Sequence, residues 1–190
     1  MQRHRRFLVA TILAVASLGG ATTASAHQLV DGTTLVPPLG PSVPCYEVGR
    51  WVRCDTSTNT SYVNLPGDDV GCGTVYLTGT QTSHATRWYE NGLLVERIVQ
   101  WKVRDSWSLS PAGAGPSLAA SIDQSWDEKF TVPGDLSSDV EVTQGNFIRI
   151  QGLGGRFIES GRYLPDGTFR GYTSAFTDAS LALICDLLTP

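Results

Sequence analysis

Two tight-turn signals, each flanked by runs of β-forming residues, constrain the fold of this chain more than any other feature. Asn91-Gly92 separates HATRWYE from LLVERIVQWKV, and a type I′ turn favours this dipeptide because both of its central residues need φ > 0. Pro165-Asp166-Gly167-Thr168 separates RFIESGRYL from FRGYTSAF in the same manner. Each pair of runs is therefore predicted to form a β-hairpin.

From Cys72 onward, short runs rich in Val, Ile, Thr, Tyr, Phe and Trp are broken by Gly, Pro, Asn and Asp, which is typical of an antiparallel all-β domain. Short connections in sequence order favour a single antiparallel meander barrel of roughly seven or eight strands, and a two-sheet β-sandwich is the alternative. We expect no helix of more than two turns, and a loop of small residues at 110–121. The predicted strands are 74–80, 83–90, 93–104, 126–132, 140–151, 155–164, 168–176 and 181–187.

The first 26 residues have the pattern of a secretory signal peptide. Three arginines precede the apolar run FLVATILAVASL, and Ala24-Ser25-Ala26 matches the small-residue motif that signal peptidase cleaves. The apolar run is shorter than the ~20 residues that span a bilayer as a helix. We therefore expect a secreted protein with no membrane insertion after signal removal. It would have a proline-rich extended arm at 27–44 and one all-β domain at 45–190.

The charge balance excludes some classes of partner. The whole chain has 14 basic and 18 acidic residues, and removal of the leader's three arginines leaves 11 basic residues in the mature chain. Lys102 and Lys129 are its only lysines. Nucleic acids and anionic membrane surfaces need clustered Lys and Arg, so neither is expected as a partner.

Four cysteines, Cys45, Cys54, Cys72 and Cys185, predict two disulfides in an exported chain. Three connectivities are open. We favour Cys45–Cys54 as a short local loop and Cys72–Cys185 as a bond between the first and last core strands. The second bond would stabilise the fold by about 4 to 5 kcal/mol on the chain-entropy model. No zinc site is expected, because the chain lacks a C-x2-C pair and two histidines remain after the leader.

Strand alternation places one charge on the otherwise apolar face of each of three strands. Arg97 shares a face with Trp101, Glu128 lies in WDEKFTV, and Glu159 shares a face with Tyr163. An unpaired charge on such a face would cost several kcal/mol, so these groups should pair with each other or reach water in a cavity. Two interpretations stay open: a structural ion pair, or the polar floor of a ligand pocket formed by these five residues.

Five tryptophans raise the question of stacking on sugar rings, as in a carbohydrate-binding module. Alternation directs Trp101, Trp126 and Trp88 toward the core, which leaves Trp51 and Trp107 as the candidates for exposure. Core or loop packing is the favoured interpretation of all five. A β-bulge, which we expect near the glycine at position 145, would shift these assignments.

Histidine is scarce, and this limits catalysis. Cleavage after the leader would leave His27 at the N-terminus, where its amine and imidazole could hold copper together with His84 as a histidine brace. A chance terminal histidine is favoured, and no metal site or cofactor is expected. His84 is also the only histidine in the interior of the mature chain, and no G-x-S-x-G motif is present, so a serine hydrolase is not indicated.

The segment from GNFIRIQGLGGRFIESGRYLPDGTFRGYTS through LALICDLL resembles a class of small secreted bacterial β-domain proteins of unknown function. In that class a strand ends in a Gly-rich turn, a second strand ends in a G-R or G-x step, and the chain closes on a strand that contains cysteine. The resemblance is restricted to the C-terminal third. It implies a barrel and supplies no activity.

These observations favour a secreted, non-catalytic binding protein that holds a small apolar or amphiphilic molecule in its barrel. One alternative is an interaction or inhibitor-type protein that binds another extracellular protein through exposed loops, residues 107–118 above all. The third class is an enzyme, either a barrel resembling a cyclase or a copper oxidase that uses His27 and His84.

Overall fold

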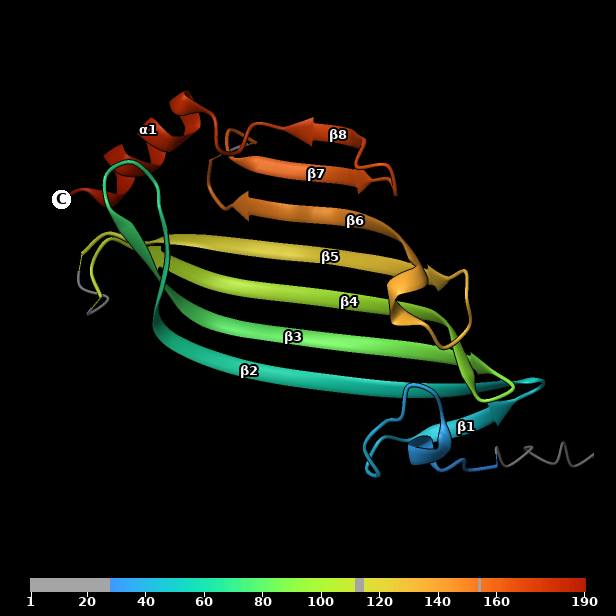
Figure 1. Ribbon diagram of the computed structural model, residues 1–190. Coiled ribbons are helices and arrows are strands. Elements are labelled where there is room, and N and C mark those ends of the chain that lie inside the picture. The colour runs from blue at the N-terminus through green and yellow to red at the C-terminus, as the bar shows by residue number, and fades with distance from the viewer. Residues whose placement is uncertain (1–27, 112–114, 154) are drawn as a thin grey trace, which may run out of the picture.

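The computed structural model describes residues 28–111, 115–153 and 155–190, which form one antiparallel sheet of eight strands (Figure 1). Each strand pairs with the next in sequence order. The all-β meander and the two disulfides are confirmed. The strands are β1 (Cys45–Val48), β2 (Trp51–Asp69), β3 (Thr74–Glu90), β4 (Leu93–Ser108), β5 (Leu118–Phe130), β6 (Asp139–Ile150), β7 (Ile158–Tyr163) and β8 (Phe169–Thr173).

The sheet is not closed into a barrel. Among the described residues, β1 pairs with β2 and β8 with β7, but the two edge strands do not pair with each other. Strand length explains this, because β1 has four residues and β8 has five, whereas β2 has 19. Because β1 pairs only with the first four residues of β2, the remainder of β2 from 55 to 69 has no strand on that side in the described structure.

The predicted strands need five corrections, the first of which is that β1 was not predicted. Segments 74–80 and 83–90 belong to one strand, β3, and β5 begins inside the predicted loop 110–121. Strand β2 was not predicted, because its centre, DTSTNTSY, is polar on both faces and has no apolar alternation. The predicted strand 181–187 is wrong, since this segment is helical.

That helix, α1 (Asp178–Leu188), is longer than the two turns that we expected as a maximum. It begins with a capping box in which the side chains of Thr177 and Ser180 each accept the other residue's backbone N–H. Ile184 and Leu188 are fully buried against the sheet. Cys185 lies on α1 and bonds to Cys72 in the β2–β3 turn, so this disulfide fastens the helix to the sheet rather than joining two strands.

The two faces of the sheet differ in what covers them. We call the face that carries Val99, Trp101 and Val103 of β4 the inner face, and the opposite one the outer face. One end of the inner face packs against α1, and the other packs against the segment 28–44, whose Leu35 is buried. Figure 1 shows these two covers at opposite ends of the sheet.

A β-bulge at the start of β4 changes which side chains face inward. Tyr89 pairs with Leu94 and Trp88 with Glu96, so Val95 has no partner on β3. Leu94 is therefore buried on the inner face, and Val95 lines a hollow on the outer face, although strict alternation from Val99 would place it on the inner face.

A second irregularity lies in β6. The register shifts between Asn146 and Ile148, just beyond the glycine at position 145, where a bulge was expected. The unpaired residue, Phe147, packs its ring on Tyr163 at 5.0 Å and on Phe169 at 6.3 Å.

Two disulfides fit an oxidising, extracellular environment. No helix in the described part of the chain has the length and apolar character needed to cross a bilayer. The predicted leader, 1–26, and His27 lie outside the described residues.

Candidate functional site

The inner face carries an ion pair between Arg97 of β4 and Glu128 of β5, which lie directly opposite each other. Arg97 Nε donates to Glu128 Oε2, and Arg97 Nη2 donates to Glu128 Oε1 at 2.6 Å. The side chain of Glu128 is 6% exposed and that of Arg97 is 31% exposed. A carboxylate buried to this extent needs such a partner. Arg97 and Glu128 therefore form an ion pair with a structural role.

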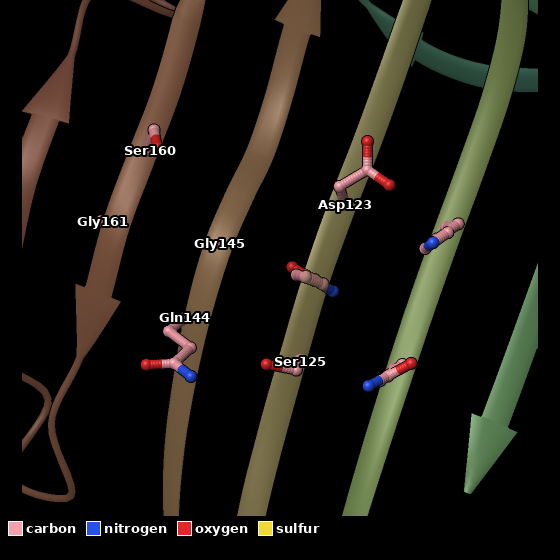
Figure 2. A pocket seen from close by; sticks show the side chains of 9 residues that line it. Asp123, Ser125, Gln144, Gly145, Ser160 and Gly161 are labelled. Atoms are coloured by element: carbon pink, nitrogen blue, oxygen red, sulfur yellow. The ribbon is translucent and has the colours of Figure 1, made fainter. Parts of the chain in front are cut away.

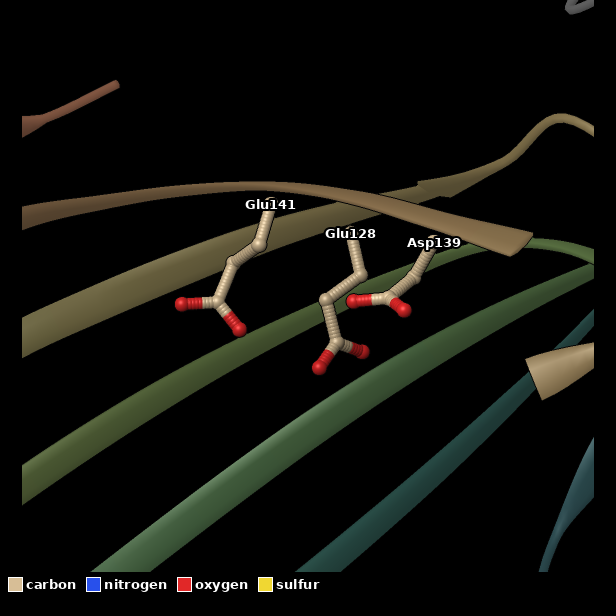
Figure 3. Close-up of side chains that lie close together, drawn as sticks. All are labelled: Glu128, Asp139 and Glu141. Atoms are coloured by element: carbon tan, nitrogen blue, oxygen red, sulfur yellow. The ribbon is translucent and has the colours of Figure 1, made fainter. Parts of the chain in front are cut away.

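Two further carboxylates lie next to that ion pair. Figure 3 shows Asp139 and Glu141 of β6 beside Glu128, with one oxygen of each residue within 4.8 Å of the others. The hydrogen bond to Glu128, together with attraction to all three carboxylates, raises the pKa of Arg97. A guanidinium thus already supplies positive charge to this cluster, and we assign no metal ion to it.

The third predicted charge, Glu159 of β7, lies apart from the ion pair. Along β6 it is opposite Ile148, whereas Glu128 is opposite Glu141. The hydroxyl of Tyr163 donates a hydrogen bond to Glu159 at 3.1 Å. Burial is the main cause that raises the pKa of Tyr163, and this hydrogen bond is the second. The structure therefore does not bring all the predicted charges together.

Trp101 lies between these two groups on the inner face. Its ring packs edge-on against Trp126, with 6.3 Å between the ring centres. Its indole N–H is buried and has no hydrogen-bond partner among the described residues. A buried donor without a partner is costly, and the indole N–H of Trp107, farther along the same face of β4, is in the same state.

An aromatic pocket lies on the outer face, where β1 to β5 come together near the β3–β4 turn. It has a volume of about 560 Å³ and is lined by Val48, Trp51, Trp88, Val95, Glu96 and Lys129. The prediction that Trp88 faces the core is wrong, because its register with Glu96 puts it on the outer face. Trp107, expected as a candidate for exposure, is buried in the core, whereas Trp51 is half-buried at the pocket.

Charged side chains around the aromatic pocket occur in pairs. Arg50 stacks over the ring of Trp51 at 4.8 Å and forms an ion pair with Glu90 at 3.4 Å. Lys129 forms an ion pair with Glu96 at 3.7 Å across the pocket rim. Arg53 likewise stacks over Trp88 at 5.7 Å and bonds Asp55 at 3.0 Å. The indoles are thus held by cation–π contacts, and the charges around them are balanced.

A second hollow on the outer face is polar. It has a volume of about 570 Å³ and crosses β4 to β7 (Figure 2). Figure 2 shows Asp123, Ser125, Gln144 and Ser160 on three neighbouring strands, with glycines between them. We call it the polar hollow; its lining residues are Gln100, Lys102, Asp123, Gln124, Ser125, Gln144, Gly145, Ser160 and Gly161.

His84 does not complete a catalytic triad. It lies opposite Ser57, and its Nε2 is 3.7 Å from Asp55 Oδ1. However, Asp55 already bonds Arg53 and accepts from the Thr86 hydroxyl at 2.7 Å. No hydrogen bond joins His84 to Ser57 in the described part of the chain, although nucleophilic catalysis requires one. The predicted copper brace needs His27, which lies outside the described residues, so it is not tested.

Comparisons with protein-family models, with curated proteins and with solved structures return no match to this chain. Its function is therefore inferred from its own side chains and their geometry.

Proposed function

We propose that this chain is a secreted, non-catalytic binding protein that holds a small amphiphilic molecule in the aromatic pocket. The observation that carries the proposal is the position of four apolar side chains, Val48, Trp51, Trp88 and Val95, around one hollow of the outer face. Along β3, for example, the outer face presents threonine at 78, 80, 82 and 86. A clustered apolar surface among polar residues is informative, whereas isolated exposed residues are not.

The chemistry of the pocket supports an uncharged ring at this point. Small-molecule sites combine apolar walls with a few polar groups that fix orientation. Here two indoles form the walls, and Glu96 and Lys129 form a polar rim. Each cation near the pocket already pairs with a carboxylate, so a charged ligand would find no unpaired group of opposite charge there. Export is supported by the leader sequence and by the two disulfides.

Titration calorimetry with octyl glucoside below its micellar concentration tests this proposal. We expect Trp88→Ala to weaken binding by about tenfold or more, because a buried indole contributes over 1 kcal/mol to a binding site. Trp101→Phe, on the inner face, is the matched control and should bind as the native protein does. Absence of binding by the native protein, or native affinity in Trp88→Ala, would contradict the proposal.

The inner face is the second candidate site for the same class of ligand, with Arg97, Glu128, Glu159, Trp101 and Tyr163 as its residues. The observation that favours it is the buried indole N–H of Trp101 without a hydrogen-bond partner in the described structure. The same titration distinguishes the two sites. A ligand on the inner face would lose affinity in Trp101→Phe and keep it in Trp88→Ala.

A further inference from the structure

The outer face carries polar side chains that have no partner. In the described residues, Gln100 of β4, Ser125 of β5 and Gln144 of β6 make no side-chain hydrogen bond, and they stand in one row across the sheet. The row continues to Arg162 of β7 and Arg170 of β8. Free amide, hydroxyl and guanidinium groups aligned across five strands form a surface that can donate many hydrogen bonds to one ligand.

Two arginines in that row lie directly opposite each other. Arg162 and Arg170 are cross-strand partners, both are exposed, and neither contacts a carboxylate within the described ranges. Like charges at directly opposed positions destabilise a sheet. Lys102, which lines the polar hollow two residues beyond Gln100, forms no ion pair among the described residues, because Asp123 directly opposite it pairs with Arg104 at 2.7 Å. Three unpaired cations thus gather on one face of a chain that is acidic in total.

The aromatic pocket and the polar hollow lie on the same face. Four residues of β4, about 13 Å, separate Glu96 at the pocket from Gln100 at the hollow. The path from β4 to β7 crosses three strand spacings, about 14 Å more. A ligand that uses both hollows is therefore an extended chain of several units rather than one ring.

We propose that the outer face binds an acidic oligosaccharide, with one sugar ring in the aromatic pocket and the following rings across the polar hollow. This rests on the proposed function and names its ligand class. The C–H face of a sugar ring is apolar enough to pack on Trp51 or Trp88, and its hydroxyls bond Gln100, Ser125 and Gln144. Its carboxylate or sulfate groups pair with Lys102 and with the two arginines, which form bidentate contacts with such anions.

Charge alone does not explain the arrangement. A flexible polyanion without rings would pair with the arginines, but it would not stack on the two indoles or form hydrogen bonds with the row of amide and hydroxyl groups. A sugar chain with acidic substituents uses all three kinds of group at once.

The test compares three probes by titration calorimetry: a hexamer of galacturonic acid, the same hexamer fully methyl-esterified, and polyglutamate of similar charge. The native protein should bind the acid hexamer most tightly and polyglutamate most weakly. Arg162→Gln/Arg170→Gln should lose about tenfold in affinity for the acid hexamer and nothing for the methyl ester. Arg156→Gln, in the β6–β7 turn, removes one charge away from the hollow and is the matched control.

Two results would overturn the proposal: equal affinity of the native protein for the acid and esterified hexamers, or polyglutamate binding as tight as that of the acid hexamer. The proposal would also be overturned if Arg162→Gln/Arg170→Gln bound the acid hexamer with native affinity. The double variant should fold normally and be slightly more stable, because it removes a like-charge pair. Loss of octyl glucoside binding with intact, arginine-dependent hexamer binding would reject the aromatic pocket alone, so failures of the two proposals are distinguishable.

Discussion

Polar side chains form pairs on both faces of this sheet, but on the outer face a row of exposed ones also stays unpaired among the described residues. On the inner face Arg97 bonds Glu128, and the Tyr62 hydroxyl donates to Asp105. On the outer face the side chain of Gln144 stays without a partner among the described residues. An unpaired polar group costs free energy when it is buried but little when water reaches it. The inner face is therefore organised for stability, and the outer face retains groups that can bind a ligand.

The largest expected effect concerns the cover of the inner face. Cys72→Ser/Cys185→Ser releases α1 and should reduce the free energy of unfolding by about 5 kcal/mol, because the bond spans 113 residues. Cys45→Ser/Cys54→Ser opens a separation of nine residues and should cost about 3 kcal/mol. Urea unfolding of both double variants measures the difference.

The same two variants also separate stability from binding. The Cys45–Cys54 bond fixes the β1–β2 hairpin that carries Val48 and Trp51, so its loss should weaken octyl glucoside binding under native conditions. Loss of the other bond should leave that affinity unchanged in the folded fraction. The reverse pattern would show that α1, and not the hairpin, supports the pocket.

Breaking the inner ion pair is the next largest effect. Arg97→Leu leaves the buried Glu128 unpaired and should cost about 3 kcal/mol, whereas Arg97→Leu/Glu128→Leu should recover most of that loss. The outer pair Lys129–Glu96 is its counterpart, since the lysine is 67% exposed, and Lys129→Leu should cost about 0.5 kcal/mol or less. A double variant as unstable as the single one would contradict the pairing argument.

Two neighbouring residues of β7, Gly161 and Ser160, compare the inner and outer faces at one point of the sheet. A Cβ at Gly161 would point to the inner face and lie 2.5 Å from the Arg170 carbonyl oxygen and 2.6 Å from the Gly171 Cα. Gly161→Ala should therefore cost about 2 kcal/mol by overpacking. Ser160→Ala, one residue earlier and on the outer face, should leave the thermal midpoint unchanged. Equal midpoints for the two variants would show that the strands can move apart at this glycine.

Local chemistry explains which parts of the fold the sequence could predict. The Asn91-Gly92 turn depends on two neighbouring residues, and both have positive φ as predicted. The disulfides depend on the need to pair every thiol, and both favoured pairs are present. Helix α1 was mistaken for a strand because LALICDLL is rich in β-compatible Leu and Ile. The Thr177–Ser180 capping box just before it was the available signal.

The aromatic pocket could not be predicted in the same way. It depends on β2, whose polar centre gave no strand signal, and on a bulge that turns Val95 outward. A bulge adds one residue, so the assignment of faces on one side of it is reversed relative to the other side, and alternation alone does not show where it occurs. Arg97 and Glu128, by contrast, lie beyond the bulge in a regular ladder, and alternation placed them on a common face.

The smallest expected effect concerns Asp105, whose carboxylate is partly buried on the inner face. Burial raises its pKa above the usual 3.8, although the hydrogen bond from Tyr62 acts in the opposite direction. The folded protein therefore holds this proton more tightly than the unfolded chain does. The resulting stability is fully present below the unfolded-state pKa, and it is lost as the pH rises through the folded-state pKa.

Asp105→Asn keeps an acceptor for the Tyr62 hydroxyl and has no charge to bury. It should therefore raise the thermal midpoint at pH 7 and leave it unchanged at pH 3, where the native carboxyl is protonated as well. Tyr62→Phe is the matched variant: it removes the only side-chain donor to Asp105 in the described residues, so it should lower the midpoint more at pH 7 than at pH 3. If Asp105→Asn lowers the midpoint at pH 7, the ionised carboxylate stabilises the inner face, and the contrast between the two faces is weaker than the buried hydrogen bonds suggest.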